Sequence, residues 1–352
     1  MHTVKIETLT PLWTGNSKGS GENLRETGII GSLRWWYEIL VRSFGGNVCD
    51  PTSGNCKDKN RCDVCELFGC TGWGRKFKLE INTREEDIEY IDGINVYSQR
   101  KKRGKKQKRP FSGIATKNKR HITLNFIPLK EVSPVEWCRL KCTLKFIAEY
   151  GALGGRISQG NGVIRIVNNS FENLDCSRVK GKTNVKNSGR NGQSVYSLEN
   201  FVIWKFKISF TAAVEDLLKE KAFPLIDDKN YAEMKEVWNN CHMLPIGFHV
   251  RDAIRPVVKN HHNNHYDLVG KGGRGSRIFV SHGYQNDEDE SMEFRVFGFF
   301  EKGEEEVCEE IKNCISNWLS AYLVAHEKGF DIKEINPISK ETGREIIERG
   351  II

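Results

Sequence analysis

Two hydrophobic periods organise the first half of the chain. A period of two residues, typical of half-buried strands, occurs in four segments, at residues 2–9, 77–81, 122–126 and 163–167. A helical period predicts one helix from Gly28 to Phe44 and a second that begins at Ser133-Pro134 and ends near Gly151. The resulting order, β-α-β-β-α-β, is that of a ferredoxin-like unit.

The second half repeats this alternation with more decoration. Residues 168–197 are rich in Asn, Ser, Gly and Lys and are interpreted as a linker. After it we expect strands at 201–211, 276–282 and 292–300 and helices at 213–222, 230–241 and 304–328. The predicted fold class is α+β, with two ferredoxin-like, RRM-like units in tandem and large loop insertions. Their boundaries are 1–170 for the first unit, 171–197 for the linker and 198–352 for the second unit.

Composition narrows the class of protein. The 352 residues are 38% hydrophobic and 28% charged, which fits a globular protein and excludes a disordered one. The chain has no apolar run of membrane-spanning length, and its start lacks the layout of a signal peptide, so we expect a cytoplasmic protein. In that compartment its 11 cysteines are expected to be thiols or metal ligands rather than a disulfide framework.

Positive charge is concentrated in one place. The net charge is +8, and residues 100–109, which we expect to lie in a loop, contain eight basic residues and no acidic one. Residues 1–176 hold 29 basic and 19 acidic residues, whereas residues 177–352 hold 25 and 27. This asymmetry favours a polyanionic partner, most simply nucleic acid. The alternatives are a solvated basic loop without a partner, or a contact with an acidic neighbouring protein.

Glycine-rich loops supply a second set of candidate phosphate contacts. Residues 151–162 lie between a predicted helix and strand, and glycines there let backbone amides approach phosphates, with donors from Arg156, Ser158 and Gln159. The loop has neither the Walker A pattern nor a Rossmann turn, and a plain connection is the alternative. Residues 270–277 form a second Gly/Arg loop, for which a surface turn is the alternative.

The first helix adds candidates of its own. Arg25 and Arg34 lie just before and within its first turns, where free amides also favour phosphate. Trp35 is off the main apolar face, so it is a candidate for stacking on a base. Trp36 and Tyr37 are expected to pack in the core.

These motifs together resemble a known family. The segment 10–15, the Gly-Ser-Leu-Arg-Trp-Trp-Tyr-Glu helix (31–38), the element Cys65-Glu66-Leu67-Phe68-Gly69 and the loop 151–162 are similar to those of the RAMP superfamily of CRISPR-associated RNA-binding proteins. Within it they most resemble the first-numbered RAMP subunits of Cmr (type III-B) RNA-targeting complexes. The resemblance covers residues 1–167 and is loose thereafter.

The resemblance implies a non-catalytic subunit that binds crRNA and target RNA within a prokaryotic antiviral ribonucleoprotein, beside other Cmr subunits. No cofactor is required for that role. The residues assigned to RNA contact are Arg25, Arg34, Trp35, Arg100, Lys101, Lys102, Arg103, Lys105, Lys106, Gly154, Gly155, Arg156, Ser158, Gln159, Gly160, Lys271, Arg274 and Arg277.

Five cysteines between residues 49 and 70 raise the question of a metal. Cys62 and Cys65 form a C-x₂-C knuckle, and Cys49 and Cys56 could complete a tetrahedral zinc site. The alternative is that these thiols only pack. In the family element, Leu67 and Phe68 are expected to pack and Gly69 to turn the chain. The six cysteines outside this segment are expected to be core thiols.

A histidine cluster supplies the competing hypothesis of an enzyme. His249, His261, His262, His265 and Tyr266 could perform acid–base chemistry in a metal-independent, CRISPR-RNA-processing endoribonuclease. Residues 259–265 also fit a polar surface loop, and no motif fixes the geometry of the imidazoles. The favoured interpretation is therefore a protein that binds RNA without cutting it.

Overall fold

The computed structural model describes residues 1–16, 19–49, 56–57, 60–102, 104–171, 174–176, 195–261, 266–270, 275–285, 291–318, 323–324 and 328–350. Most of the predicted linker lies outside these ranges. The described residues form a four-stranded sheet, a six-stranded sheet and a two-stranded hairpin. None of their helices is both long and apolar enough to cross a membrane.

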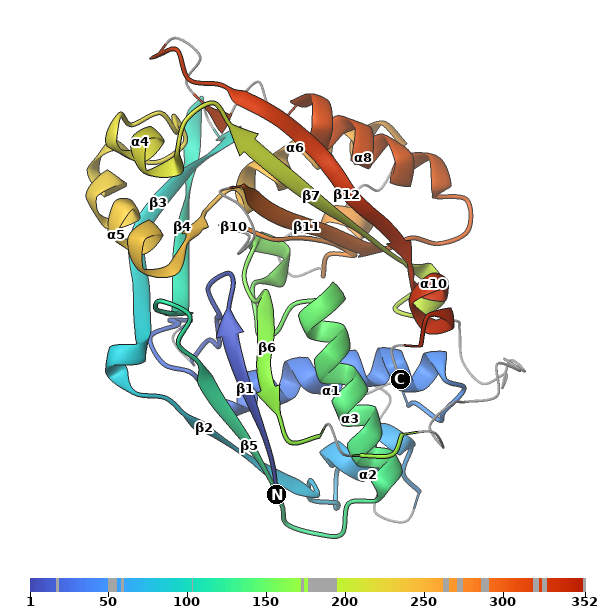
Figure 1. The fold of residues 1–352 in the computed structure, drawn as a ribbon. Coiled ribbons are helices and arrows are strands. Elements are labelled where there is room, and N and C mark those ends of the chain that lie inside the picture. Colours follow the sequence, from blue (N-terminus) through green and yellow to red (C-terminus); the bar gives the residue numbers. More distant parts are fainter. Residues whose placement is uncertain are drawn as a thin grey trace.

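The first unit has the predicted order of elements. Its members are β1 (His2–Thr8), α1 (Glu26–Ser43), α2 (Asp63–Phe68), β2 (Phe77–Asn82), β3 (Ile88–Lys102), β4 (Lys105–Thr116), β5 (Ile122–Pro128), α3 (Pro134–Tyr150) and β6 (Ile164–Asn169). The sheet order β2-β5-β1-β6 is antiparallel throughout, which is the ferredoxin-like arrangement (Figure 1). The ferredoxin-like prediction for this half is confirmed.

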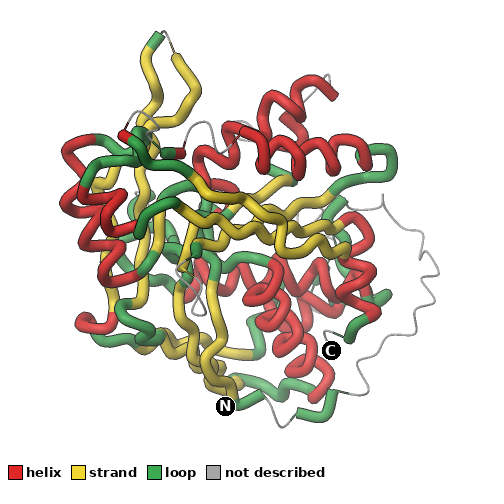
Figure 2. The backbone as a smooth tube through the Cα atoms, turned by 45° about the horizontal axis from the view of Figure 1, so that its top comes forward, coloured by secondary structure: helices red, strands yellow, loops and turns green. Residues whose placement is uncertain are grey.

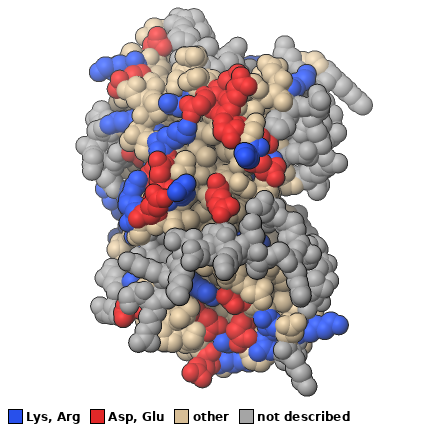
Figure 3. Space-filling model, turned by 90° about the vertical axis from the view of Figure 1, so that its right-hand side faces the viewer, with Lys and Arg blue, Asp and Glu red and all other residues tan. Residues whose placement is uncertain are grey.

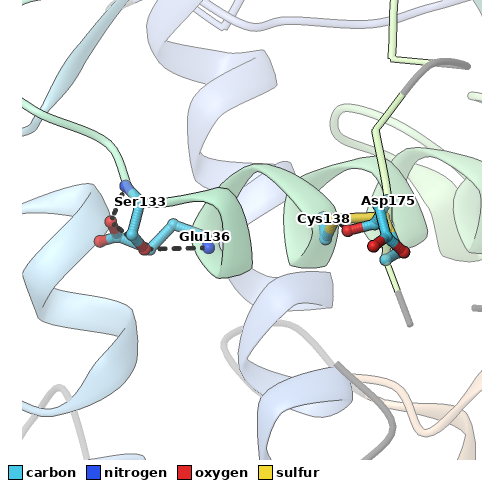
Figure 4. The surroundings of a disulfide bond; sticks show 5 residues. Ser133, Glu136, Cys138 and Asp175 are labelled. Carbon is cyan, nitrogen blue, oxygen red and sulfur yellow. Dashed lines mark hydrogen bonds between the residues drawn. A yellow bond between two sulfur atoms is a disulfide. The ribbon is translucent and has the colours of Figure 1, made fainter. Parts of the chain in front are cut away.

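Local signals account for the start of α3. The Ser133 side chain accepts a hydrogen bond from the Glu136 amide, and the Glu136 carboxylate accepts one from the Ser133 amide, as Figure 4 shows. Pro134 occupies the first helical position, where its missing N–H costs nothing. The predicted helix start is therefore confirmed.

The second unit repeats the topology. Its elements are β7 (Phe201–Phe210), α4 (Val214–Lys219), α5 (Tyr231–Cys241), β8 (Met243–Leu244), α6 (Gly247–His261), α7 (Tyr266–Val269), β9 (Ile278–Val280), β10 (Gly283–Gln285), β11 (Met292–Phe299), α8 (Glu305–Trp318), β12 (Ile332–Thr342) and α10 (Gly343–Glu348). The strands follow the order β12-β7-β11-β10-β8, with β9 also paired to β11. Helix α6, strand β12 and helix α10 were not predicted from the sequence.

The basic run, residues 100–109, was predicted to lie in a loop. The structure instead places its described residues in the paired strands β3 and β4 and the turn between them. Their apolar residues explain the difference. Ile91, Ile94, Val96 and Phe111 are buried in the same core as β7, β11 and α6 of the second unit. An insertion in the first unit is thus held in strand form by packing against the second, which local sequence does not reveal.

The two units also share a core across the second sheet. Along β7, Phe201 and Ile203 face the core of α1 and α3, whereas Trp204 and Phe206 face the core that contains α6 and α8. This alternation places α1 and α3 between the two sheets and α6 and α8 outside the second sheet (Figure 1). The second sheet is consequently covered on both faces.

One prediction about the cysteines is wrong. Cys138 of α3 and Cys176, which follows β6, form a disulfide with a Cα–Cα distance of 5.5 Å (Figure 4). Both were expected to be core thiols. The sequence could not reveal the pair, because the two cysteines are 38 residues apart and only the return of the chain beside α3 brings them together.

Candidate nucleic-acid interface

The tip of the β3–β4 hairpin is a basic feature of the described surface. Lys105 and Lys106 are exposed, and the backbone register sets Lys102 opposite Lys105 and Lys101 opposite Lys106. The tip projects beyond the rest of the fold (Figure 2). The side chains of Arg100, Lys101 and Lys102 and the whole of Arg103 lie outside the described part of the structure.

The lower part of the same hairpin is partly neutralised. Lys108 pairs with Asp227 at 2.5 Å, and its ammonium lies 5.4 Å from the ring centroid of Tyr97. The Lys108 ammonium holds the pKa of the Asp227 carboxyl below its ordinary value, and the Tyr97 hydroxyl adds to this effect by donating a hydrogen bond to the same carboxyl. The free positive charge is therefore concentrated toward the tip.

The glycines of the 151–162 loop make room for protein. A Cβ on Gly155 would lie 2.7 Å from the Trp13 ring, and one on Gly154, whose φ is +84°, would lie 2.7 Å from the Trp13 carbonyl oxygen. The Gly155 amide donates to that oxygen at 2.8 Å. The sequence predicted that Gly154 and Gly155 approach phosphate, whereas the structure shows them approaching Trp13.

Arg156 is held over Trp13. Its guanidinium lies 4.3 Å from the centroid of the Trp13 ring and donates to Ser112 Oγ of β4 at 2.8 Å. Arg156 remains partly exposed, so one face of a fixed cation is available at the base of the hairpin. Trp13 is not among the residues that were predicted to contact RNA. Its place in the motif 10–15 was the signal that could have identified it.

The other end of the loop is fixed by the second unit. Gly160 lies against the His282 imidazole, where a Cβ would come within 2.5 Å of the ring, and its carbonyl oxygen accepts from the His282 amide. Arg251 of α6 donates to the carbonyl oxygen of Ser158 at 2.6 Å. The prediction that Gly160 contacts RNA is wrong, because this residue is buried at the junction of the two units. Ser158 and Gln159 beside it are partly exposed.

Two buried histidines lie beneath this junction. Burial lowers the pKa of His249 to about 3, helped by the nearby charge of Lys106, and burial lowers that of His282 to about 3 as well, with His249 adding to the effect. His282 Nδ1 accepts a hydrogen bond from the Gly247 amide at 3.1 Å, which requires a neutral ring. The junction is therefore built on uncharged imidazoles.

This arrangement predicts a pH-dependent stability. In the unfolded chain both rings take up a proton near pH 6.5, whereas the folded chain keeps them neutral to about pH 3. The unfolded state binds more protons, so stability falls as pH drops through 6.5, by about 2–3 kcal/mol between pH 7 and 5.5. Urea unfolding across this range measures the change. His282→Phe should roughly halve the pH dependence of stability, and the control His121→Gln should leave that dependence unchanged. A His282→Phe protein with the full pH dependence would contradict the prediction.

The start of α1 offers one free cation. Arg25 is exposed immediately before the helix, as predicted. Arg34 is instead committed within the protein: its guanidinium donates to Glu38 Oε1 at 3.1 Å, to the Gly69 carbonyl oxygen at 2.9 Å and to Cys65 Sγ at 3.3 Å. Each donating nitrogen thus has a protein partner, so the structure gives Arg34 a role in packing α2 against α1.

Trp35 was predicted to stack on a base, but it packs against aromatic rings of the protein instead. Its ring contacts those of Trp36, Tyr196, Phe279 and Phe299 in edge-on geometry, at centroid distances of 4.6–5.9 Å. Trp36 and Tyr37 are buried, as predicted. The structure therefore corrects the interpretation of Trp35, whose ring is already used by the aromatic cluster between the units.

In the second Gly/Arg loop, the structure corrects the predicted role of Arg277 in RNA contact. Only 8% of this residue is exposed, and its guanidinium pairs with Glu304 and donates to the Phe299 carbonyl oxygen. A buried, fully paired arginine cannot bind RNA in the folded protein. Lys271 and Arg274 lie outside the described residues.

The histidines of the enzyme hypothesis are not gathered at one site among the described residues. His249 is 2% exposed, whereas His261, at the end of α6, pairs through Nε2 with Glu310 of α8 at 2.8 Å. His262, His265 and the side chain of Tyr266 lie outside the described part. Residues 259–261 were interpreted as surface loop and are helical instead.

The four candidate metal ligands are brought together. The Sγ atoms of Cys49, Cys56, Cys62 and Cys65 all lie within 4.8 Å of one another. Leu67 and Phe68 are buried, and Gly69 turns the chain with a φ of +90°, as the family element implied. Within this segment, residues 63–68 form α2, a helix of six residues that carries Cys65.

Comparison with protein families decides the identity of the first unit. A family model described as the RAMP superfamily matches residues 5–165, from within β1 to the start of β6. Residues 5–165 form a RAMP-superfamily unit. No curated protein matches the chain.

Three solved structures that are similar to this chain come from Cmr systems. Cmr1 from Pyrococcus furiosus in its apo form is 14% identical, with a TM-score of 0.41 over 86% of this chain and 88% of that one. A chain of a type III-B Cmr-beta complex bound to cognate target RNA and AMPPnP, in the presence of ssDNA, is 12% identical, with a TM-score of 0.45 over 90% of this chain and 99% of that one. A chain of the same type of complex bound to cognate target RNA is 12% identical, with a TM-score of 0.42 over 89% of this chain and 99% of that one.

Proposed function

We propose that this RAMP protein is a non-catalytic RNA-binding subunit of a type III-B (Cmr) CRISPR effector complex, active in antiviral defence in the prokaryotic cytoplasm. The observation that carries the proposal is the hairpin tip. There Lys105 and Lys106 are exposed, and the strand register sets each of them opposite another lysine. The assignment to the Cmr group rests on the sequence motifs in residues 1–167.

The energetics of the tip support a polyanion as the partner. Like charges directly opposite each other destabilise a strand pair. The paired lysines therefore lower the stability of the tip unless negative charges bind there. Phosphates supply such charges, and replacing condensed counterions along RNA adds to the affinity. On the side of the molecule that faces away from β3 and β4, acidic and basic side chains are interspersed instead (Figure 3).

The remaining free cations extend this surface toward the body of the protein. Ser112, which holds Arg156, lies six residues from Lys106 along β4, or about 20 Å at the rise of a strand. A single strand of RNA running between them would meet phosphate contacts at both ends. Contacts of this kind read the backbone and leave sequence selection to pairing between crRNA and target RNA.

The decisive experiment compares two charge-matched variants. Lys105→Ser/Lys106→Ser should weaken binding to a labelled single-stranded RNA and flatten the plot of log K against log salt. Each lost phosphate contact reduces the slope by about 0.7, so the expected change is up to about 1.4. Fluorescence anisotropy at four or more salt concentrations measures it.

The control removes the same charge elsewhere. Lys302→Ser/Lys333→Ser alters two exposed lysines outside the hairpin and should leave the slope unchanged. An unchanged slope for the hairpin variant would reject RNA as its partner and favour an acidic protein subunit. Equal changes in both variants would mean that only the total charge matters.

The competing function is a metal-independent endoribonuclease. The pairing of His261 with Glu310 and the burial of His249 argue against it, because a general base must reach the proton that it abstracts. Incubating the wild type with labelled RNA in a chelator should give no cleavage. Cleavage that His261→Ala, His262→Ala or His265→Ala abolishes would make the protein a processing enzyme.

A further inference from the structure

The cysteine cluster beside α2 has the geometry of a metal centre. Cys62 and Cys65 are 2% and 1% exposed, and the partly buried Cys49 and Cys56 reach them from the segment between α1 and α2. Zinc–sulfur bonds of about 2.3 Å place tetrahedral sulfurs about 3.8 Å apart. Cys49 Sγ and Cys65 Sγ are 3.6 Å apart, and no pair among the four Sγ atoms is separated by more than 4.8 Å.

The groups around the sulfurs suit thiolates. The Cys62 amide donates to Cys56 Sγ at 3.3 Å, and the Cys65 amide donates to Cys62 Sγ at 3.4 Å. The Arg34 guanidinium adds a charged donor to Cys65 Sγ at 3.3 Å. Donors of this kind stabilise negative sulfur and orient metal ligands, whereas four neutral thiols have no need of them.

We propose that Cys49, Cys56, Cys62 and Cys65 hold one structural Zn²⁺ ion. Four thiolates leave no open position, which fits a structural and not a catalytic ion, and an all-sulfur tetrahedral set favours zinc over harder cations. On binding, Zn²⁺ replaces the protons of the thiols, and these pass to solvent. The site then carries a net charge of −2, which the Arg34 guanidinium partly offsets.

The ion would cross-link two parts of the RAMP unit. Its ligands join the segment after α1 to α2, and Arg34 bridges α1 to both Cys65 and Gly69. Val64 and Leu67 of α2 are wholly buried in the core around α1. Losing the ion would free this short helix, so the stability of the unit depends on the metal whether or not the protein binds RNA.

The wild-type full chain provides the first test. Protein purified without added metal should contain about one zinc per chain by elemental analysis, and a strong chelator should remove it together with several degrees of thermal stability. Replacing zinc by Co²⁺ should give the visible absorption of tetrahedral cobalt thiolate. Protein without metal, with iron in place of zinc, or with these cysteines in disulfides would overturn the proposal.

Matched serine variants locate the ion. Cys62→Ser and Cys65→Ser should lose most of the zinc. Cys70→Ser should keep it, because Cys70 follows α2 in the same segment and is not among the four clustered thiols. Zinc retained by both knuckle variants, or lost only from Cys70→Ser, would contradict this ligand set. RNA binding by the Cys70→Ser protein reports separately on the proposed function.

Discussion

Trp36→Ala is expected to lower the free energy of unfolding by about 3–5 kcal/mol. Trp36 is wholly buried between the two sheets, with Phe146, Phe201 and Phe297 at centroid distances of 5.3, 6.5 and 5.9 Å. Truncation leaves a large cavity and also removes the hydrogen bond from Trp36 Nε1 to the Ala152 carbonyl oxygen, at 2.8 Å. Urea unfolding followed by circular dichroism measures the loss.

Two controls show whether the shared core is responsible. Trp36→Phe keeps most of the volume and should lose markedly less stability. Leu129→Ala, at a residue 61% exposed, should change stability by less than about 0.5 kcal/mol. A loss below about 1 kcal/mol in Trp36→Ala would contradict the conclusion that α1 joins the two units.

Arg277→Ala is the second substitution with a large expected effect, again about 3–5 kcal/mol, because it leaves the Glu304 carboxylate buried without its cation. The two side chains form a two-pronged pair at 2.5 and 3.2 Å, and Arg277 Nε donates to the Phe299 carbonyl oxygen at 3.0 Å. Chemical unfolding measures the effect. RNA affinity of the folded variant should stay unchanged, in contrast with the sequence-based prediction of RNA contact.

The exposed pair Arg344–Glu348 is the matched control. Its side chains are 84% and 64% exposed, so Arg344→Ala should cost at most about 1 kcal/mol. The double variant Arg277→Met/Glu304→Met should recover most of the stability lost in Arg277→Ala, because it removes both buried charges. Reduced RNA affinity in a stably folded Arg277→Ala protein would restore this residue to the interface.

The elements of the first unit could be predicted because their signals are local. Alternation along β1, the glycines after α1 and the capping box at Ser133 each act within a few residues. The ferredoxin-like order then followed from the sequence of elements. The hairpin escaped prediction because its basic outer half resembles a loop, while its apolar inner half is held by residues more than 100 positions later.

The candidate interface was predicted in composition and missed in detail. Lys105, Lys106 and Arg25 are exposed, as a charge count suggests. Arg34 and Arg277 carry the same charge but have partners inside the protein, at Cys65 and Glu304. Trp35 was assigned to RNA because a helical period cannot show the second sheet that covers it.

The sequence by itself determined the β-α-β-β-α-β order of the first unit, the excess of positive charge at residues 100–109 and the short spacing of the four cysteines that lie beside α2. These depend on local periodicity, composition and short spacing. Only the tertiary structure decided which cations remain free, which glycines face protein and how Cys138 finds Cys176. The physical reason is that burial and ion pairing are set by contacts between distant segments, and no local pattern encodes them.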